Sequence, residues 1–146
     1  MRRTVRMTMT IDQIRKAGIR HLWICTITIA VLHIALVIGG RFIGLEDYII
    51  YRKASSWAVA FSFLELNAVT WMWSWIAARH KDYLSTYHTV VSGFRMLLVL
   101  IILGIIAAVI GRDQAVPYVV AFLAYYFVLL ILHSLFFAKM ANKLFR

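Results

Sequence analysis

The chain has 146 residues, of which 63% are hydrophobic and only 15% are charged. Because soluble domains carry about a quarter charged residues, this composition excludes an ordinary soluble domain and predicts a polytopic membrane protein. The net charge of +10 does not require nucleic acid as a partner, since basic residues collect at the cytoplasmic ends of membrane spans. The single cysteine, Cys25, excludes an intramolecular disulfide and a multi-cysteine zinc site.

The first twenty residues are basic and predict a short amphipathic surface helix over about residues 11–20. Its start is indicated by Thr10 and Gln13, which have the spacing of a capping box. The basic side chains of this helix would lie among the lipid headgroups. Two roles stay open for it: a docking arm for lipid or a partner, and a plain flank that sets the topology.

Four apolar runs follow, each close to the roughly 20 residues that a helix needs to cross a bilayer. They predict membrane spans at about residues 22–40, 54–78, 90–110 and 117–137. Short loops make consecutive spans antiparallel neighbours. We therefore expect one membrane domain over residues 1–146, an all-α antiparallel bundle of four transmembrane helices in a lipid bilayer.

The basic residues are distributed unequally between the two predicted sides of the membrane. Twelve of the 16 Lys and Arg fall in or beside the N-terminal arm, the loop after the second span and the C-terminus. Since cytoplasmic segments carry the excess of Lys and Arg, we expect both termini to be cytoplasmic.

Glu65 lies near the middle of the second predicted span, where a charged side chain is costly and needs a partner. Counted from the predicted cytoplasmic ends of their spans, Glu65 and His33 lie at similar depths of roughly 20 and 17 Å. We therefore expect a hydrogen bond between them; alternatively, Glu65 is protonated and neutral. Asn67, Arg95 and His133 are the other polar residues at intramembrane positions.

Arg95 and His133 lie nearer the predicted cytoplasmic surface. The side chain of Arg95 could extend to the headgroups, bridge to His133 or reach toward Glu65. The last option looks unfavourable, because Arg95 and Glu65 differ by roughly 10 Å in predicted depth.

Two features of the spans indicate close helix packing. Asn67, Thr70 and Ser74 form a polar stripe along the second span, and Gly104 and Ala108 form a small-xxx-small pair on the third. Both features allow helices to approach closely and to share side-chain hydrogen bonds. We expect packing within the chain, with a homo-oligomer face as the alternative.

The tryptophans predict where the spans meet the membrane surface, since Trp is enriched at the interface. We expect five to act as interfacial anchors: Trp23, Trp57, Trp71, Trp73 and Trp75.

Motifs for catalysis and metal binding are missing from the sequence. It has no Gly-rich phosphate loop, no H-E-x-x-H and no G-x-S-x-G, and its five histidines are scattered. We therefore expect no enzyme activity, no metal site and no cofactor.

Three segments between Ser62 and Lys143 carry a likeness to a known family. They are Trp75-Ile76-Ala77-Ala78-Arg79-His80, Ser92-Gly93-Phe94-Arg95-Met96-Leu97-Leu98, and Asp113-Gln114-Ala115-Val116-Pro117-Tyr118 leading into Phe122-Leu123-Ala124-Tyr125-Tyr126-Phe127. In these segments the chain resembles divergent members of the family of ATP synthase protein I, a small accessory membrane protein of bacterial F-type ATP synthases. Similar proteins often have Lys at the place of Arg95 and can have an acid at the place of His133.

The resemblance implies a bacterial cytoplasmic membrane protein that assembles or stabilises the rotor ring of the synthase, in contact with its membrane subunits and without catalysis. We therefore expect a non-enzymatic accessory or assembly factor. The alternative is a small oligomeric transporter or flippase, coupled to protons or cations through Glu65, since such sites usually lie near the membrane midplane.

Overall fold

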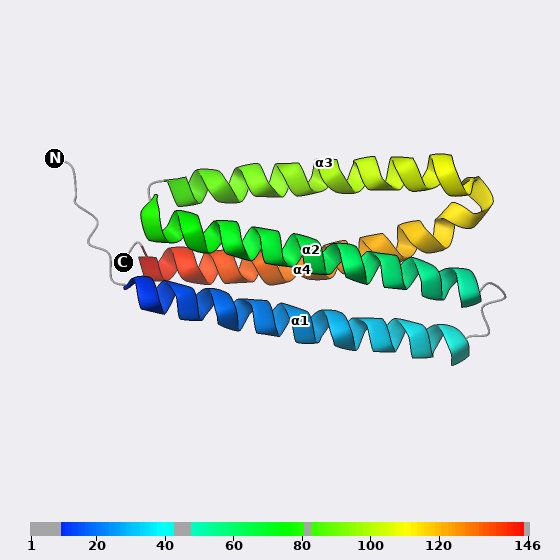
Figure 1. Cartoon of the computed structure of the whole chain (residues 1–146), viewed down its shortest axis with the longest axis horizontal. Coiled ribbons are helices and arrows are strands. Elements are labelled where there is room, and N and C mark those ends of the chain that lie inside the picture. The colour runs from blue at the N-terminus through cyan, green and yellow to red at the C-terminus, as the bar shows by residue number, and fades with distance from the viewer. Residues whose placement is uncertain (1–9, 43–47, 81–82, 145–146) are drawn as a thin grey trace.

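The computed structural model describes residues 10–42, 48–80 and 83–144, which form four long helices and contain no strand. The helices are α1 (Ile11–Phe42), α2 (Tyr48–Arg79), α3 (Leu84–Ile110) and α4 (Arg112–Leu144). They run alternately in opposite directions along one elongated bundle (Figure 1). The start of α1 and the end of α4 share the terminal end of the bundle, and the opposite end is called the loop end. The prediction of an all-α fold is confirmed for the described residues.

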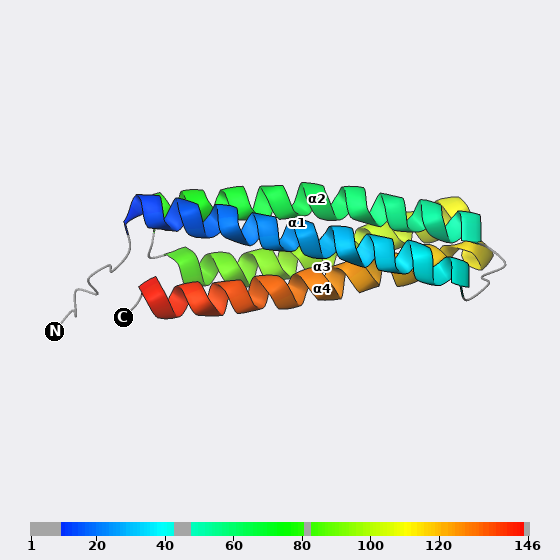
Figure 2. The same ribbon diagram turned by 90° about the horizontal axis from the view of Figure 1, so that it is seen from below.

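Helices α2 and α4 pack together across the short diagonal of the bundle. α2 packs mainly against α1 and α4, and α3 packs mainly against α4, whereas the described parts of α1 and α3 lie apart. Figure 1 shows α1 and α3 at the two outer edges, and in Figure 2, turned by 90°, α2 follows the upper edge of the same elongated bundle. The residues of α2 and α4 therefore supply most of the interior.

The helices are longer than the sequence predicts. The capping box is formed, with the Thr10 N–H donating to Gln13 Oε1 at 2.9 Å and the Gln13 N–H donating to Thr10 Oγ1 at 3.4 Å. From this cap α1 continues to Phe42, so the separate surface helix at 11–20 and first span at 22–40 are one helix. The segment that joins them contains no proline or glycine to break it.

The ends of the other helices also differ from their predicted positions. α2 begins at Tyr48 and α3 at Leu84, about six residues before the predicted spans at 54 and 90. The chain turns from α3 into α4 at Gly111, whose φ of +85° is a conformation that favours glycine. These added turns lengthen each helix at the bundle ends, and they change the depth at which its polar residues lie.

Three described segments are long and apolar enough to cross a membrane: Ile11–Phe42, Thr86–Ile110 and Ala115–Lys143. α2 does not meet this condition, so the prediction of four spans is supported for three helices. Its apolar sequence is interrupted by Glu65 and Asn67 and by several serines. The buried positions of α2 recur every three or four residues and include three hydroxyl side chains, those of Ser55, Ser62 and Thr70. The side of a helix that packs against its neighbours does not need the apolar surface that a lipid-facing side requires.

Two hydrophobic clusters fill the interior. The cluster nearer the terminal end centres on Trp73, with residues of α3 and α4 such as Tyr87 and Phe137 packed around it. The cluster nearer the loop end has Cys25 and Ile29 of α1 among its buried members. One group of polar side chains lies between the two clusters, and a second group lies within the cluster nearer the loop end.

Candidate functional site

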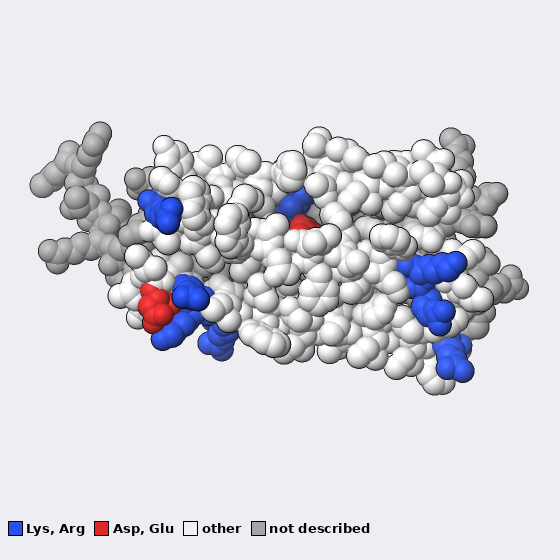
Figure 3. All heavy atoms as spheres, in the orientation of Figure 1, with Lys and Arg blue, Asp and Glu red and all other residues white. Residues whose placement is uncertain are grey.

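The most unusual feature of the interior is an ion pair between α2 and α3. Arg95 Nε contacts Glu65 Oε1, and the two side chains are only 5% and 10% exposed. Figure 3 shows the charged atoms gathered at the two ends of the bundle, with one small blue and red patch at mid-length. Removing one partner of a buried pair leaves an uncompensated charge, which makes these two residues mutually dependent.

The observed helix ends explain why Arg95 reaches Glu65. Arg95 lies eleven residues after Leu84, about 17 Å from the terminal end of α3 at helical rise. Glu65 lies fourteen residues before Arg79, about 21 Å from the same end of α2. The side chain of Arg95 spans the remaining few ångströms. The expected 10 Å difference is wrong because α3 begins at Leu84 instead of residue 90. Arg95 points inward instead of extending to the headgroups.

Two buried histidines share this level of the bundle. The rings of His21 in α1 and His133 in α4 meet edge to face, with centroids 4.9 Å apart. His21 also stacks on Phe136 at 4.0 Å. His21 lies ten residues from Ile11 and His133 eleven residues from Leu144, about 15 and 17 Å from the terminal end, which is the depth of Arg95. Glu65, Arg95, His21 and His133 are called the ionic layer.

Hydrogen bonding within the ionic layer is incomplete. His133 Nδ1 donates to the carbonyl oxygen of Leu129 at 2.8 Å, which leaves Nε2 as the acceptor of the neutral ring. This Nε2 atom and Arg95 Nη2 are buried and have no hydrogen-bond partner. His21 is contacted on its other side by Cys25, whose Sγ lies 3.5 Å from Nε2. The layer thus holds a spare donor and a spare acceptor in an apolar surrounding.

His33 lies in a different place from the one predicted. It is 22 residues after Ile11, about 33 Å from the terminal end and roughly 12 Å beyond Glu65. Its Nδ1 lies 2.9 Å from Ser55 Oγ and 3.2 Å from Tyr125 Oη, and these two oxygens are 3.1 Å apart. The expected Glu65–His33 hydrogen bond is therefore replaced by two separate sets of contacts.

His33, Ser55 and Tyr125 are called the neutral layer, and they join α1, α2 and α4. Sequence reasoning missed Ser55 and Tyr125. The available signal was the run of small residues Ala54, Ser55 and Ala58, which are all fully buried and let α1 approach α2 closely.

The polar stripe of α2 lies along the contact with α1. Thr70 is buried, and Ser74 Oγ donates to the Thr70 carbonyl at 2.9 Å. Opposite them is Gly18, where an added Cβ would lie only 2.7 Å from Ser74 Oγ. Asn67 is exposed and its side chain donates to the Phe63 carbonyl of its own helix at 2.8 Å. Thr70 and Ser74 therefore belong to a helix contact, and Gly18 is the small residue that permits it.

The small pair of α3 packs against no other described part of the chain. Gly104 and Ala108 are both exposed, and in the described structure a Cβ at Gly104 would meet nothing within 4 Å beyond its own helix backbone. The expected intramolecular role is therefore wrong for this pair. Its face of α3 is open to lipid or to another helix.

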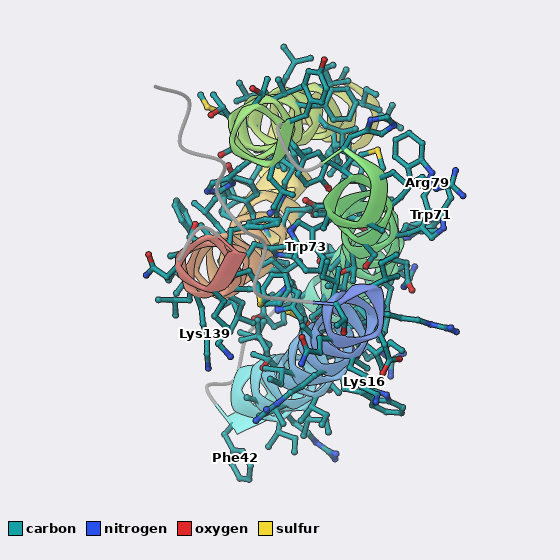
Figure 4. All side chains as sticks on the ribbon, turned by 90° about the vertical axis from the view of Figure 1, so that its left-hand side faces the viewer. Lys16, Phe42, Trp71, Trp73, Arg79 and Lys139 are labelled. Atoms are coloured by element: carbon teal, nitrogen blue, oxygen red, sulfur yellow. The ribbon has the colours of Figure 1, made fainter. Side chains whose placement is uncertain are left out.

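One of the five tryptophans is not an anchor. Trp73 is fully buried and its ring lies 4.8 Å from that of Phe136, edge to face. Figure 4 shows Trp73 between the helices, whereas Trp71 lies on the outside near Arg79. The side chains of the other four tryptophans are exposed: Trp23, Trp57, Trp71 and Trp75. Trp73 faces inward because it lies on the buried stripe of α2, two residues from Trp71 on the opposite side of the helix.

Within the described residues no group of three or more His, Cys, Asp or Glu side chains is placed to hold a metal ion. No family model, no curated protein and no solved structure matches this chain.

Proposed function

We propose that this protein is a non-enzymatic accessory or assembly factor of a membrane, which acts by lateral packing of its helices against a partner. The observation that carries the proposal is the Glu65–Arg95 ion pair. The strongest intramembrane charges neutralise each other inside the chain, and the neutral layer likewise bonds internally. The outer surface is apolar along α1, α3 and α4 and remains available for contacts with lipid or another helix.

We propose that all four helices cross the membrane. α1 ends at the loop end and α3 begins at the terminal end (Figure 1). If α1 and α3 both span the bilayer, the segment that connects them must cross the bilayer as well. α2 is that return segment. Its buried polar residues are compatible with this position, because Arg95 pairs with Glu65 and the neighbouring helices cover Ser55, Ser62 and Thr70.

The distribution of basic residues supports a cytoplasmic terminal end. Arg15, Lys16 and Arg20 of α1 and Lys139 and Lys143 of α4 all lie there. This excess over the loop end favours cytoplasmic termini in a bacterial inner membrane.

The resemblance to ATP synthase protein I suggests the membrane subunits of an F-type ATP synthase as partner. The open face around Gly104 and Ala108 is the candidate contact, since small residues let a second helix approach closely. Affinity purification of the tagged chain from native membranes, followed by mass spectrometry, tests this partner. Synthase subunits should co-purify, and their absence would contradict the assignment.

A matched pair of variants tests the mode of contact. Gly104→Leu should reduce recovery of the partner, because the larger side chain blocks close approach. Gly39→Leu is the control, since a Cβ at Gly39 on α1 also meets nothing within 4 Å. Equal recovery with both variants would show that the face around Gly104 is not the contact.

A second function is favoured by one specific observation, the spare polar atoms beside Glu65. The buried Glu65 carboxylate pairs with Arg95 in a layer that also holds the unpartnered Arg95 Nη2 and His133 Nε2, and such a layer is a candidate ion-coupling centre. If the protein is a transporter, liposomes that contain it should show pH-dependent flux, and Glu65→Gln should abolish that flux. Absence of flux together with a recovered partner would support the accessory role.

A further inference from the structure

A groove between α1 and α4 opens at the terminal end of the bundle. It has a volume of about 460 Å³. Its rim is basic, with Lys16 and Arg20 from α1 and Lys139 from α4. Figure 4 looks onto this end and labels Lys16 and Lys139, which come from the two helices that enclose the groove.

The walls of the groove below its rim are apolar. Ile24 of α1 and Leu135 and Phe136 of α4 form this part. Ile24 and Leu135 are exposed in the structure, and Phe136 is held in place by its stack on His21. The groove therefore has a positively charged entrance and apolar walls.

The order of these residues along the helices matches that of a phospholipid. Lys16 and Lys139 lie five residues from the terminal ends of α1 and α4, about 8 Å deep. Ile24 lies thirteen residues from Ile11, about 20 Å deep. Cations at the depth of the headgroups and apolar walls at the depth of the acyl chains are what one lipid molecule requires.

The charge at the rim is complementary to an anion. Lys16 pairs with Asp12 at 2.8 Å, but both side chains are largely exposed, at 75% and 69%. A solvent-exposed pair of this kind is weak, so Lys16 can exchange its partner for a phosphate. Arg20 and Lys139 add two further positive charges on either side of the groove.

We propose that this groove binds one anionic phospholipid, with its phosphate among Lys16, Arg20 and Lys139 and an acyl chain along Ile24, Leu135 and Phe136. The site requires a membrane location but does not depend on which protein is the partner. The lipid would also cover His21, the member of the ionic layer that lines the groove.

Native mass spectrometry of the full-length chain in detergent tests the site, with dioleoyl-phosphatidylglycerol and dioleoyl-phosphatidylcholine as probes. The wild type should retain phosphatidylglycerol preferentially. The variant Lys16→Gln/Arg20→Gln/Lys139→Gln should lose at least about tenfold in retention, because each cation contributes to anionic lipid binding. The matched control is Arg41→Gln/Arg52→Gln/Lys53→Gln, which removes the same charge at the loop end and should bind as the wild type does.

Three outcomes would overturn the proposal. Equal loss in the two triple variants would indicate attraction by net charge alone. Displacement of the lipid by inorganic phosphate would indicate a free-phosphate site. Unchanged retention in Leu135→Gln would show that no acyl chain lies in the groove.

If the triple variant does not fold, the single variants Arg20→Gln and Lys139→Gln, measured against Lys53→Gln, decide the question. Loss of lipid retention would leave recovery of a protein partner unaffected, so the two proposals fail separately.

Discussion

The two polar layers of the bundle satisfy buried polar groups in different ways. In the ionic layer the charges of Glu65 and Arg95 depend on each other, and other polar atoms of the layer have no partner. In the neutral layer His33, Ser55 and Tyr125 contact one another at 2.9 to 3.2 Å, so that each group has two partners. The ionic layer therefore has no redundancy, whereas the neutral layer can lose one contact and keep another.

This difference has an energetic consequence. Breaking a buried ion pair by removing one partner leaves a charge in a region of low dielectric, which costs more than a lost neutral hydrogen bond. We expect sensitivity to substitution to be highest at Arg95 and lower through the neutral layer. Four predictions test that ranking.

The largest effect is expected for Arg95→Leu. It leaves the Glu65 carboxylate buried without a partner and should reduce the free energy of unfolding by about 3–5 kcal/mol. The measurement is an SDS titration of the purified protein in mixed micelles. The double variant Glu65→Leu/Arg95→Leu should recover most of this loss, since no charge remains in the interior. If the double variant is less stable than Arg95→Leu, the ion pair is not the source of the effect.

A smaller effect is expected for Tyr125→Phe in the neutral layer. The substitution removes the hydroxyl that contacts His33 and Ser55, but these two residues still bond to each other. The free energy of unfolding should fall by about 1–2 kcal/mol. Tyr118→Phe, at a half-buried tyrosine of the same helix, serves as the control and should change little. A loss as large as that of Arg95→Leu would remove the distinction between the layers.

A substitution of glycine in α1 should destabilise the protein near the terminal end, where α1 packs closely on α2, but not near the loop end. A Cβ at Gly18 would lie 2.7 Å from Ser74 Oγ, so Gly18→Ala forces Ser74 to give up its bond to Thr70. We expect a destabilisation of about 1 kcal/mol. Gly39→Ala, near the loop end of α1, meets open space and should be neutral or stabilising. Adding Ser74→Ala to Gly18→Ala should restore stability if the clash is the cause.

The smallest effect is expected for His133→Met. A nonpolar side chain of similar size removes the unsatisfied Nε2 acceptor together with the hydrogen bond from Nδ1 to the Leu129 carbonyl. These two changes oppose each other, and the ion pair stays in place. The free energy of unfolding should change by less than about 1 kcal/mol. A loss comparable to that of Arg95→Leu would show that His133 takes part in the charge network. The same SDS titration measures it.

The composition and the hydropathy pattern were sufficient to predict a helical membrane protein. The excess of apolar residues and the spacing of the long apolar runs are local properties, and backbone groups in a bilayer can be satisfied only within a helix or a closed barrel. The capping box at Thr10 and Gln13 could also be predicted, because it is local: both of its hydrogen bonds lie within four residues of chain. The positions of the helix ends were harder to predict, because charged and apolar residues continue the helices beyond the predicted membrane boundaries.

The pairing of the polar residues could not be read from the chain. The earlier start of α3 shifts Arg95 by about 9 Å along the bundle, and the earlier start of α1 shifts His33 by about 17 Å. Together these two shifts exchange His33 for Arg95 as the neighbour of Glu65. Which side of a helix is buried also depends on its neighbours, so Trp73 and Trp71 look alike in sequence and lie on opposite sides of α2.

Residue type and local order thus establish the class of protein, the helices and the presence of costly polar groups in apolar segments. The arrangement of the four helices decides which of those groups meet. α2 and α4 occupy the interior, Arg95 of α3 is brought onto Glu65, and the Gly104–Ala108 face is left open. The reason is that the energy of a buried polar group depends on atoms more than twenty residues away in the chain, and only packing places those atoms beside it.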